Sequence, residues 1–200
     1  LNNLLASASD DGRAVLWELG AQQTDIPLLG SDSPITSLAF SPDGMSLAAG
    51  GTNGLLMQWD LAILRWRVLP RPHSVAAISG VAFAPNGLSV ATSSEDGTVV
   101  VWDVARNQPR GDPLQNNPVS TIHRAYAVAF SPDGRWLAAA NDDGSVAVWD
   151  VSREHIIDRV CAVVGRNLTP DEWTQHVGTR YSSTCPNIPA AAARSESVSR

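Results

Sequence analysis

The chain has 200 residues, of which 44% are hydrophobic and 17% charged, a balance typical of a soluble globular protein of one or two domains. Its formal net charge of −6 disfavours a nucleic acid as partner, since the densest basic group is the loose trio Arg65, Arg67 and Arg71. The absence of lysine excludes P-loop, protein-kinase and Schiff-base sites within this chain. No apolar stretch reaches the roughly 18 residues of a membrane span.

The chain opens at Leu1 on a strand-like pattern rather than on a methionine, so we expect its true N-terminus to lie further upstream. Four segments then end alike, each with a tryptophan six residues after an Asp or Asn. They are Asp11–Trp17, Asn53–Trp59, Asp96–Trp102 and Asp143–Trp149. The tryptophans follow one another at steps of 42, 43 and 47 residues, and a four-stranded propeller blade has roughly 40 to 45.

Three segments also begin alike, at Leu38–Gly44, Val81–Gly87 and Val128–Gly134, with a proline followed by Asp-Gly or Asn-Gly. These residues favour a chain reversal, so a first strand such as Ile35–Phe40 is expected before each turn. A second, a third and a fourth strand are expected after this turn in a full unit. The third strands are almost continuously apolar, which is typical of a strand whose two faces are covered by neighbouring sheets. We predict second strands at Leu47–Gly51, Ser89–Ser93 and Trp136–Ala140, third strands at Thr98–Val104 and Ser145–Val151, and an outer strand at Trp66–Leu69.

The repeat divides the chain into a partial unit over residues 1–33 and fuller units over 34–76, 77–120 and 121–151. Pro109–Pro118, rich in Pro, Gly and Asn, predicts a loop inserted before the last unit. Residues 152–189 predict a helical tail, because apolar residues recur at helical spacing from Ile156 to Val164 and Thr169–Glu172 can start a second helix. Residues 190–200 are small and polar and predict a disordered end.

The turns and Trp-Asp endings between residues 4 and 151 resemble WD40 repeats. The resemblance implies an all-β fold, a segment of a WD40-type β-propeller with about four blades, the first and last incomplete. Its four repeated tryptophans are then expected in the core. Since propellers protect their sheet edges by closing a ring, we expect this piece by itself to expose blade faces and to self-associate.

In the WD40 family a strand hydroxyl, a turn Asp, a Trp and a His form a buried hydrogen-bond chain. Carried over by position, the resemblance implies one such chain in the third unit and a shorter one in the first. The residues are His73, Thr92, Asp96 and Trp102 in the third unit, and Ser7, Asp11 and Trp17 in the first. Ala49 and Ala139 replace the hydroxyl in the other units and Asn53 replaces the Asp, so these units are expected to depend on apolar packing.

The tail segment Cys161–Trp173, with Tyr181 and Thr184–Pro186 beyond it, resembles the C-terminal ending of bacterial multidomain WD40 proteins. In that group a STAND-type nucleotide-binding module or a protein kinase precedes the propeller. The resemblance implies a cytoplasmic, non-catalytic scaffold or sensor that signals to upstream domains. Two alternatives stay open: an enzyme with a hydrolase or lyase site in the propeller channel, and a purely structural closure module.

Three exposed turn acids, Asp10, Glu95 and Asp142, recur on the same loop of different units. They predict an acidic rim for a basic protein or peptide, with solvated turns as the plainer interpretation. Trp66 on the outer strand is a candidate exposed anchor.

The two cysteines leave a choice between a Cys161–Cys185 disulfide and a buried thiol at Cys161, and their low number favours a reducing setting. No spacing indicates a metal, a cofactor or a catalytic group, and none is predicted.

Overall fold

The computed structural model describes residues 4–19, 25–28, 32–70, 73, 76–115 and 124–152. The chain divides into two compact units, Leu1–Asp150 and Val151–Arg200. Every regular element among the described residues is a β-strand, so the all-β prediction is confirmed for that part of the chain. No helix within it is long and apolar enough to cross a membrane. The predicted helical tail and disordered end lie outside the described residues, apart from Ser152, and stay predictions.

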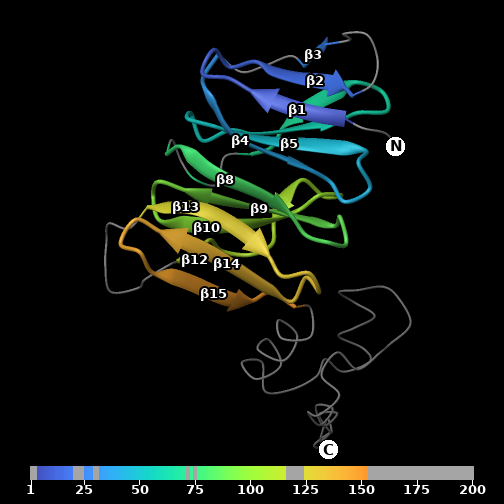
Figure 1. Cartoon of the computed structure of the whole chain (residues 1–200). Helices are drawn as coiled ribbons and strands as arrows, with labels where there is room; N and C mark the ends of the chain where they lie inside the picture. Colours follow the sequence, from blue (N-terminus) through green and yellow to red (C-terminus); the bar gives the residue numbers. More distant parts are fainter. Residues whose placement is uncertain are drawn as a thin grey trace, which may run out of the picture. The chain divides into compact units, whose positions relative to one another are not determined.

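The described strands form four antiparallel sheets that follow one another in chain order (Figure 1). Sheet 1 contains β1 (Leu4–Ala8), β2 (Ala14–Glu18) and β3 (Asp25–Leu28). Sheet 2 contains β4 (Ile35–Phe40), β5 (Ser46–Gly51), β6 (Leu56–Asp60) and β7 (Arg65–Val68). Sheet 3 contains β8 (Ile78–Phe83), β9 (Ser89–Ser94), β10 (Thr98–Asp103), β11 (Gln108–Pro109) and β12 (Leu114–Gln115). Sheet 4 contains β13 (Ala125–Phe130), β14 (Trp136–Asn141) and β15 (Val146–Asp150).

The predicted strands correspond closely to the observed ones. The expected first strand is β4, with the same bounds, and each predicted second strand differs by one residue at one end. The outer strand β7 begins one residue earlier than predicted, at Arg65. The predicted loop at Pro109–Pro118 is wrong in part, because β11 and β12 lie there and both pair with β10. Sheet 3 therefore has an outer edge split into two short pieces.

The Ser-Pro-Asp-Gly turn is held by bonds between near neighbours in the sequence. The Ser41 hydroxyl donates to Asp43 Oδ1 at 2.5 Å, and the same oxygen accepts the Met45 N–H at 2.9 Å. Gly44 has a φ of 69°, a backbone conformation that costs glycine little. Ser131 and Asp133 repeat the arrangement between β13 and β14. These contacts reverse the chain locally, which explains why the motif predicts its hairpin so well.

Apolar clusters join sheet 1 to sheet 2 and sheet 2 to sheet 3, and Trp59 and Trp102 each pack in the cluster shared with the preceding sheet. The first cluster joins sheets 1 and 2 through Ala14, Leu16, Leu28, Leu47, Met57 and Trp59. The second joins sheets 2 and 3 through Ala48, Leu56, Leu69, Val90, Val100 and Trp102. Complete burial of side chains of this size stabilises the fold by about 1.5–3 kcal/mol each.

The inner strands are also joined by hydrogen bonds at a repeated bulge. Register shifts occur between Ile35 and Ser37 in β4 and between Ile78 and Gly80 in β8. The bulged Thr36 donates its hydroxyl to the Ile78 carbonyl of sheet 3, and the bulged Ser79 donates to the Ala125 carbonyl of sheet 4. In β4 and β8 the bulge therefore turns one hydroxyl towards the next sheet.

The two end sheets are less covered than the sequence pattern predicts. Trp59 and Trp102 are fully buried, but Trp17 and Trp149 are only half-buried, so the prediction that all four lie in the core is wrong for these two. The predicted coverage of both faces is also wrong for β15, where Val146 is 63% exposed and Val148 57%. No sheet of the described residues precedes sheet 1 or follows sheet 4, and Val146 and Val148 mark the face of sheet 4 that the described residues leave uncovered.

Candidate functional site

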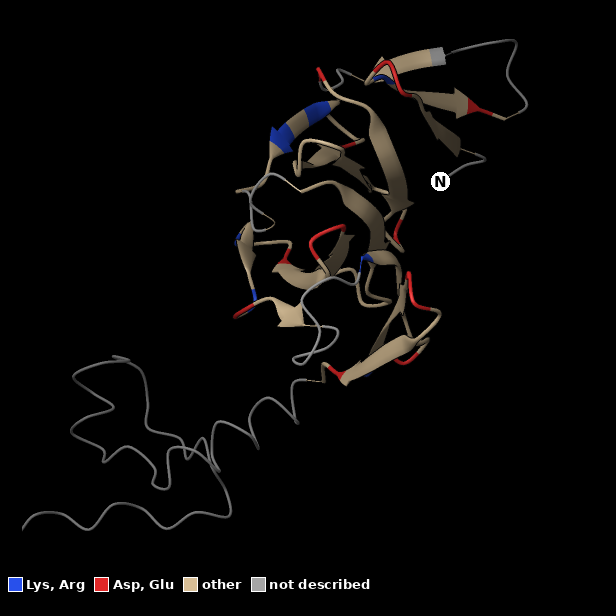
Figure 2. Ribbon diagram, turned by 90° about the vertical axis from the view of Figure 1, so that its left-hand side faces the viewer, with Lys and Arg blue, Asp and Glu red and all other residues tan. Residues whose placement is uncertain are grey.

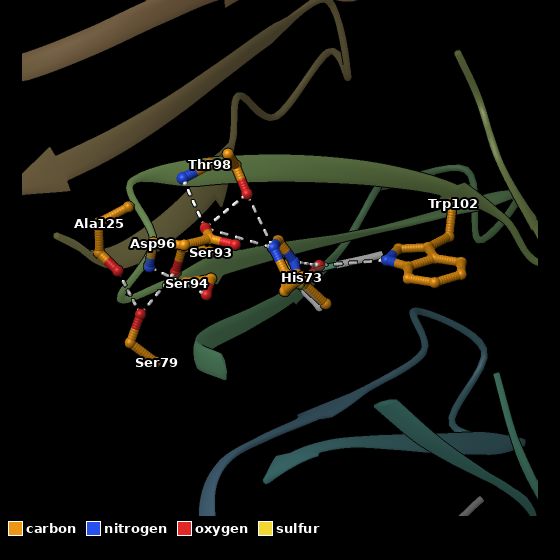
Figure 3. Close-up of polar contacts among 9 residues, drawn as sticks. His73, Ser79, Ser93, Ser94, Asp96, Thr98, Trp102 and Ala125 are labelled. Carbon is orange, nitrogen blue, oxygen red and sulfur yellow. Dashed lines mark hydrogen bonds and ion pairs between the residues drawn. The ribbon is translucent and has the colours of Figure 1, made fainter. Parts of the chain in front are cut away.

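His73 lies at the centre of a polar chain in sheet 3, and its side chain is fully buried. Its Nε2 is 2.7 Å from Thr92 Oγ1 on β9, which also accepts the indole N–H of Trp102 at 3.1 Å. Its Nδ1 is 2.8 Å from Thr98 Oγ1 on β10, and the Thr98 hydroxyl donates to Asp96 Oδ1 at 2.6 Å (Figure 3). The chain thus joins both strands, the turn between them and the segment that precedes β8.

The groups that can only donate or only accept determine which atom is the donor in each hydrogen bond of this polar chain. The Trp102 indole can only donate, so the Thr92 oxygen accepts from it. The Thr92 hydroxyl donates to His73 Nε2 when that nitrogen carries no proton. The Thr98 proton goes to Asp96, so the Thr98 oxygen accepts the N–H of His73 Nδ1. These contacts pair each of these buried polar atoms, and they place a ring proton on Nδ1. A fully paired buried network of this kind makes its surroundings rigid.

Asp96 is the charged end of the chain. Burial acts to raise its pKa, but the His73 ring, with Nδ1 3.7 Å from Asp96 Oδ1, and the hydroxyl and N–H donors of Thr98 outweigh that effect. Together they lower the pKa of Asp96 from 3.8 to about 2. The carboxylate therefore stays ionised at neutral pH and holds the turn that carries Glu95.

Thr98 was not among the predicted residues of the chain, although it bridges His73 and Asp96. The signal was present, because Thr98 is a hydroxyl residue directly after Asp-Gly. The family pattern names the His and the Asp of the chain but no residue between them. The His73 and Asp96 side chains are 3.7 Å apart, whereas the Thr98 hydroxyl lies 2.8 Å from His73 and 2.6 Å from Asp96, so it is the closer partner of each. Only the placement of the histidine beside β10 makes this role visible.

Sheet 1 has part of the same hydrogen-bond chain. The Trp17 indole on β2 donates to Ser7 Oγ on the paired strand β1 at 2.8 Å. Asp11 Oδ1 accepts the Arg13 N–H at 3.0 Å and holds its own turn, so the structure does not connect it to Ser7 or Trp17. This shorter version is exposed to solvent.

In sheet 2 the missing hydroxyl leaves a polar atom without a partner. Ala49 stands at the register position that Thr92 occupies in sheet 3, and among the described residues the buried Trp59 Nε1 has no hydrogen-bond partner. Asn53, in place of the turn Asp, accepts the Leu55 N–H at 3.1 Å and keeps the turn closed. Sheet 2 is therefore held by apolar packing at this point, as the sequence comparison between units predicts.

The three predicted rim acids lie exposed at the same end of their sheets, in the turns between second and third strands. We call Asp10, Glu95 and Asp142 the acid rim. Glu95 Oε1 lies 3.5 Å from Arg124 Nη1, so part of its charge is balanced. The structure does not place Trp66 with them, because Trp66 pairs with Trp59 near the other end of β6.

Among the residues that the structure describes, no group of three or more His, Cys, Asp or Glu side chains is arranged to hold a metal ion. Cys161 and Cys185 lie outside that part of the chain, so their pairing stays open.

Comparison with known proteins identifies the repeat. The model of the family described as WD domain, G-beta repeat matches residues 23–60, 67–103 and 116–150, together more than half of the chain. The chain belongs to the WD40-repeat family. The matches at 23–60 and 67–103 each begin in or near the outer strand of one sheet and end with the third strand of the next, so the repeat unit spans two sheets.

Similar proteins match short stretches of this WD40 chain. The guanine nucleotide-binding protein subunit beta of Saccharomyces cerevisiae is 35% identical over 60 residues, which are 30% of this chain and 14% of the yeast protein. Protein NEDD1 of Bos taurus is 32% identical over 62 residues, which are 31% of this chain and 9% of the bovine protein. The chain thus spans a small part of the length of either relative.

Proposed function

We propose that this chain is a non-catalytic scaffold that binds a basic segment of a protein partner along the acid rim. The observation that carries the proposal is the placement of Asp10, Glu95 and Asp142 at one end of three sheets, on turns closed by backbone hydrogen bonds of 3.1 to 3.2 Å. Acidic groups gathered on one rim attract a basic partner and favour its orientation. WD40-repeat proteins generally act as protein-interaction scaffolds, which supports this assignment.

The polar chain of sheet 3 supports the rim mechanically. It fixes Asp96, and the Glu95 N–H donates to the Ala77 carbonyl at 3.0 Å, so the turn that carries Glu95 is anchored on both sides. A rigid turn loses little conformational entropy on binding, which increases affinity for a given set of contacts.

The experiment measures binding of a fluorescent arginine-rich peptide to the full chain. The variant Asp10→Asn/Asp142→Asn should weaken binding by roughly three- to tenfold, with the effect shrinking at high salt. The matched control is Glu18→Gln/Asp112→Asn, which changes the net charge equally at two exposed acids outside the rim. Glu95→Gln by itself should weaken binding only slightly, because Arg124 already balances part of its charge. Equal weakening by rim and control variants would contradict the proposal.

We further propose that the scaffold is the sensor end of a larger cytoplasmic bacterial signalling protein. The resemblance of Cys161–Trp173 to the endings of bacterial multidomain WD40 proteins supports this, and it makes a nucleotide-binding module or a protein kinase the expected upstream partner. The coding region upstream of Leu1 tests the proposal. A P-loop or kinase signature in the same reading frame supports it, and an in-frame region without either contradicts it.

A further inference from the structure

The outer edges of the sheets differ in their ability to accept another strand. In sheet 1 the edge strand β3 contains Pro27, and in sheet 3 the edge is split between β11 and β12. No outer strand of sheet 4 is among the described residues. The edge strand β7 of sheet 2 is therefore the one continuous, proline-free outer strand in the described part of the chain. Proline and broken strands block strand addition, and β7 has neither.

The open side of β7 carries backbone groups without a strand partner. The Leu69 N–H donates to the Leu56 carbonyl at 2.8 Å, and the β6–β7 register pairs Gln58 with Arg67. Since hydrogen-bonded and non-bonded pairs alternate in an antiparallel ladder, Arg67 points its N–H and C=O towards β6, and Trp66 and Val68 point theirs outward. Trp66 is 41% exposed and Val68 43%.

One face of β7 is basic. Arg65 and Arg67 alternate with Trp66 and Val68, so the two arginines share one face of the strand. Both arginines, together with Trp66, line a hollow of about 370 Å³ between sheets 2 and 3. Arg67 Nη2 donates to Gln58 Oε1 at 2.9 Å and to the Val104 carbonyl at 3.1 Å. Both acceptors are uncharged, so these two bonds fix the position of the Arg67 guanidinium and do not neutralise its positive charge. Figure 2 shows this strand as a basic segment in a chain of net charge −6.

We propose that β7 binds an extended acidic segment of a protein partner, which adds to sheet 2 as a further strand. Its backbone pairs with Trp66 and Val68, its acidic side chains lie towards Arg65 and Arg67, and its apolar side chains lie on the other face beside Trp66. The partner is thus a strand in which acidic and apolar residues alternate. This surface goes beyond the acid rim, because it lies on a different edge and selects the opposite charge.

The geometry favours a peptide over a nucleic acid. A strand edge offers backbone N–H and C=O groups that another polypeptide satisfies in register, and a sugar-phosphate chain has no matching row of donors and acceptors.

The test uses a short fluorescent peptide in which glutamate alternates with valine, with the full chain as binding partner. Arg65→Glu should weaken binding by roughly tenfold or more. The control Arg13→Glu makes the same charge change at a side chain that is 77% exposed on sheet 1, and it should leave binding nearly unchanged. A peptide of the same composition with its glutamates grouped together should bind much more weakly, because the alternation is lost.

A second variant tests the backbone. Val68 occupies the register position that Pro27 occupies in sheet 1, so Val68→Pro introduces a residue that this fold already accepts there. It removes the outward N–H and should abolish binding, and Val68→Thr, which keeps the N–H, should retain it. Unchanged binding by Arg65→Glu and Val68→Pro overturns the proposal, as does an oligonucleotide that binds this edge in place of the peptide. The acid-rim variants should leave this binding intact, so the two proposals fail separately.

Discussion

Trp59 and Trp102 occupy the same register position in neighbouring sheets, but of these two only Trp102 has an indole with a hydrogen-bond partner among the described residues. The difference arises because Ala49 stands where sheet 3 has Thr92. Both tryptophans are fully buried, so the unpaired indole of Trp59 carries the desolvation cost of about 1–3 kcal/mol without the bond that offsets it. The repeat thus tolerates the loss of one polar contact where the apolar packing is complete.

Restoring that hydroxyl should stabilise the protein. In Ala49→Ser the new oxygen stands where Ser7 accepts the indole of Trp17 in sheet 1, so we expect a gain of about 1 kcal/mol in the free energy of unfolding, measured by urea denaturation. The control Ala48→Ser places a hydroxyl on the neighbouring residue, in an apolar cluster, and should destabilise by a similar amount. Equal effects of the two substitutions would argue against a specific bond to Trp59.

Removing the Thr92 hydroxyl should be costly. Thr92→Val keeps the shape of the side chain but leaves the Trp102 indole and His73 Nε2 without their shared partner, so we expect a loss of about 2–3 kcal/mol. Thr92→Ser keeps the hydroxyl and should lose clearly less. The free energies of unfolding of the two variants decide the point, and a loss as large in Thr92→Ser would assign the effect to packing.

Stability should fall in acid because of Asp96. Its folded-state pKa is depressed from 3.8 to about 2, so its contribution is present above pH 4 and is lost as the pH falls towards 2. For a side chain that is 31% exposed, solvent screening limits this contribution to about 1 kcal/mol. Asp96→Asn should lower the melting temperature at neutral pH and flatten its dependence between pH 4 and 2. Asp11→Asn, in the equivalent turn without a histidine beside it, should change this dependence much less.

The open face of sheet 4 should cause self-association. Val146 stands at the position of Leu56 and Val99, which are buried at 1% and 0% exposure in sheets 2 and 3. We expect the full chain to sediment as concentration-dependent oligomers and Val146→Lys/Val148→Lys to shift it towards the monomer. Leu19→Lys/Leu88→Lys changes two exposed leucines elsewhere and should have little effect. A single monomer species of the unmodified chain would contradict this prediction.

Most strands were predictable because their limits depend on contacts between near neighbours. The Ser41, Asp43 and Gly44 turn closes through bonds spanning five residues or fewer, and β4 has the predicted bounds. The outer edge of sheet 3 was not predictable in the same way, because β11 and β12 are too short to show a pattern and exist through their pairing with β10. The bridging role of Thr98 likewise depends on a histidine 25 residues away.

By itself, the sequence determined the all-β class, the order of the strands and the turns between them, since these follow from short-range hydrogen bonds and backbone preferences. The tertiary structure alone decided which copies of the motif are buried. Trp102 and Trp149 end nearly identical segments, yet Trp102 is fully buried and Trp149 only half-buried. Burial is supplied by neighbouring sheets, which come from distant parts of the chain, and the same residues therefore form a core in one sheet and a surface in another.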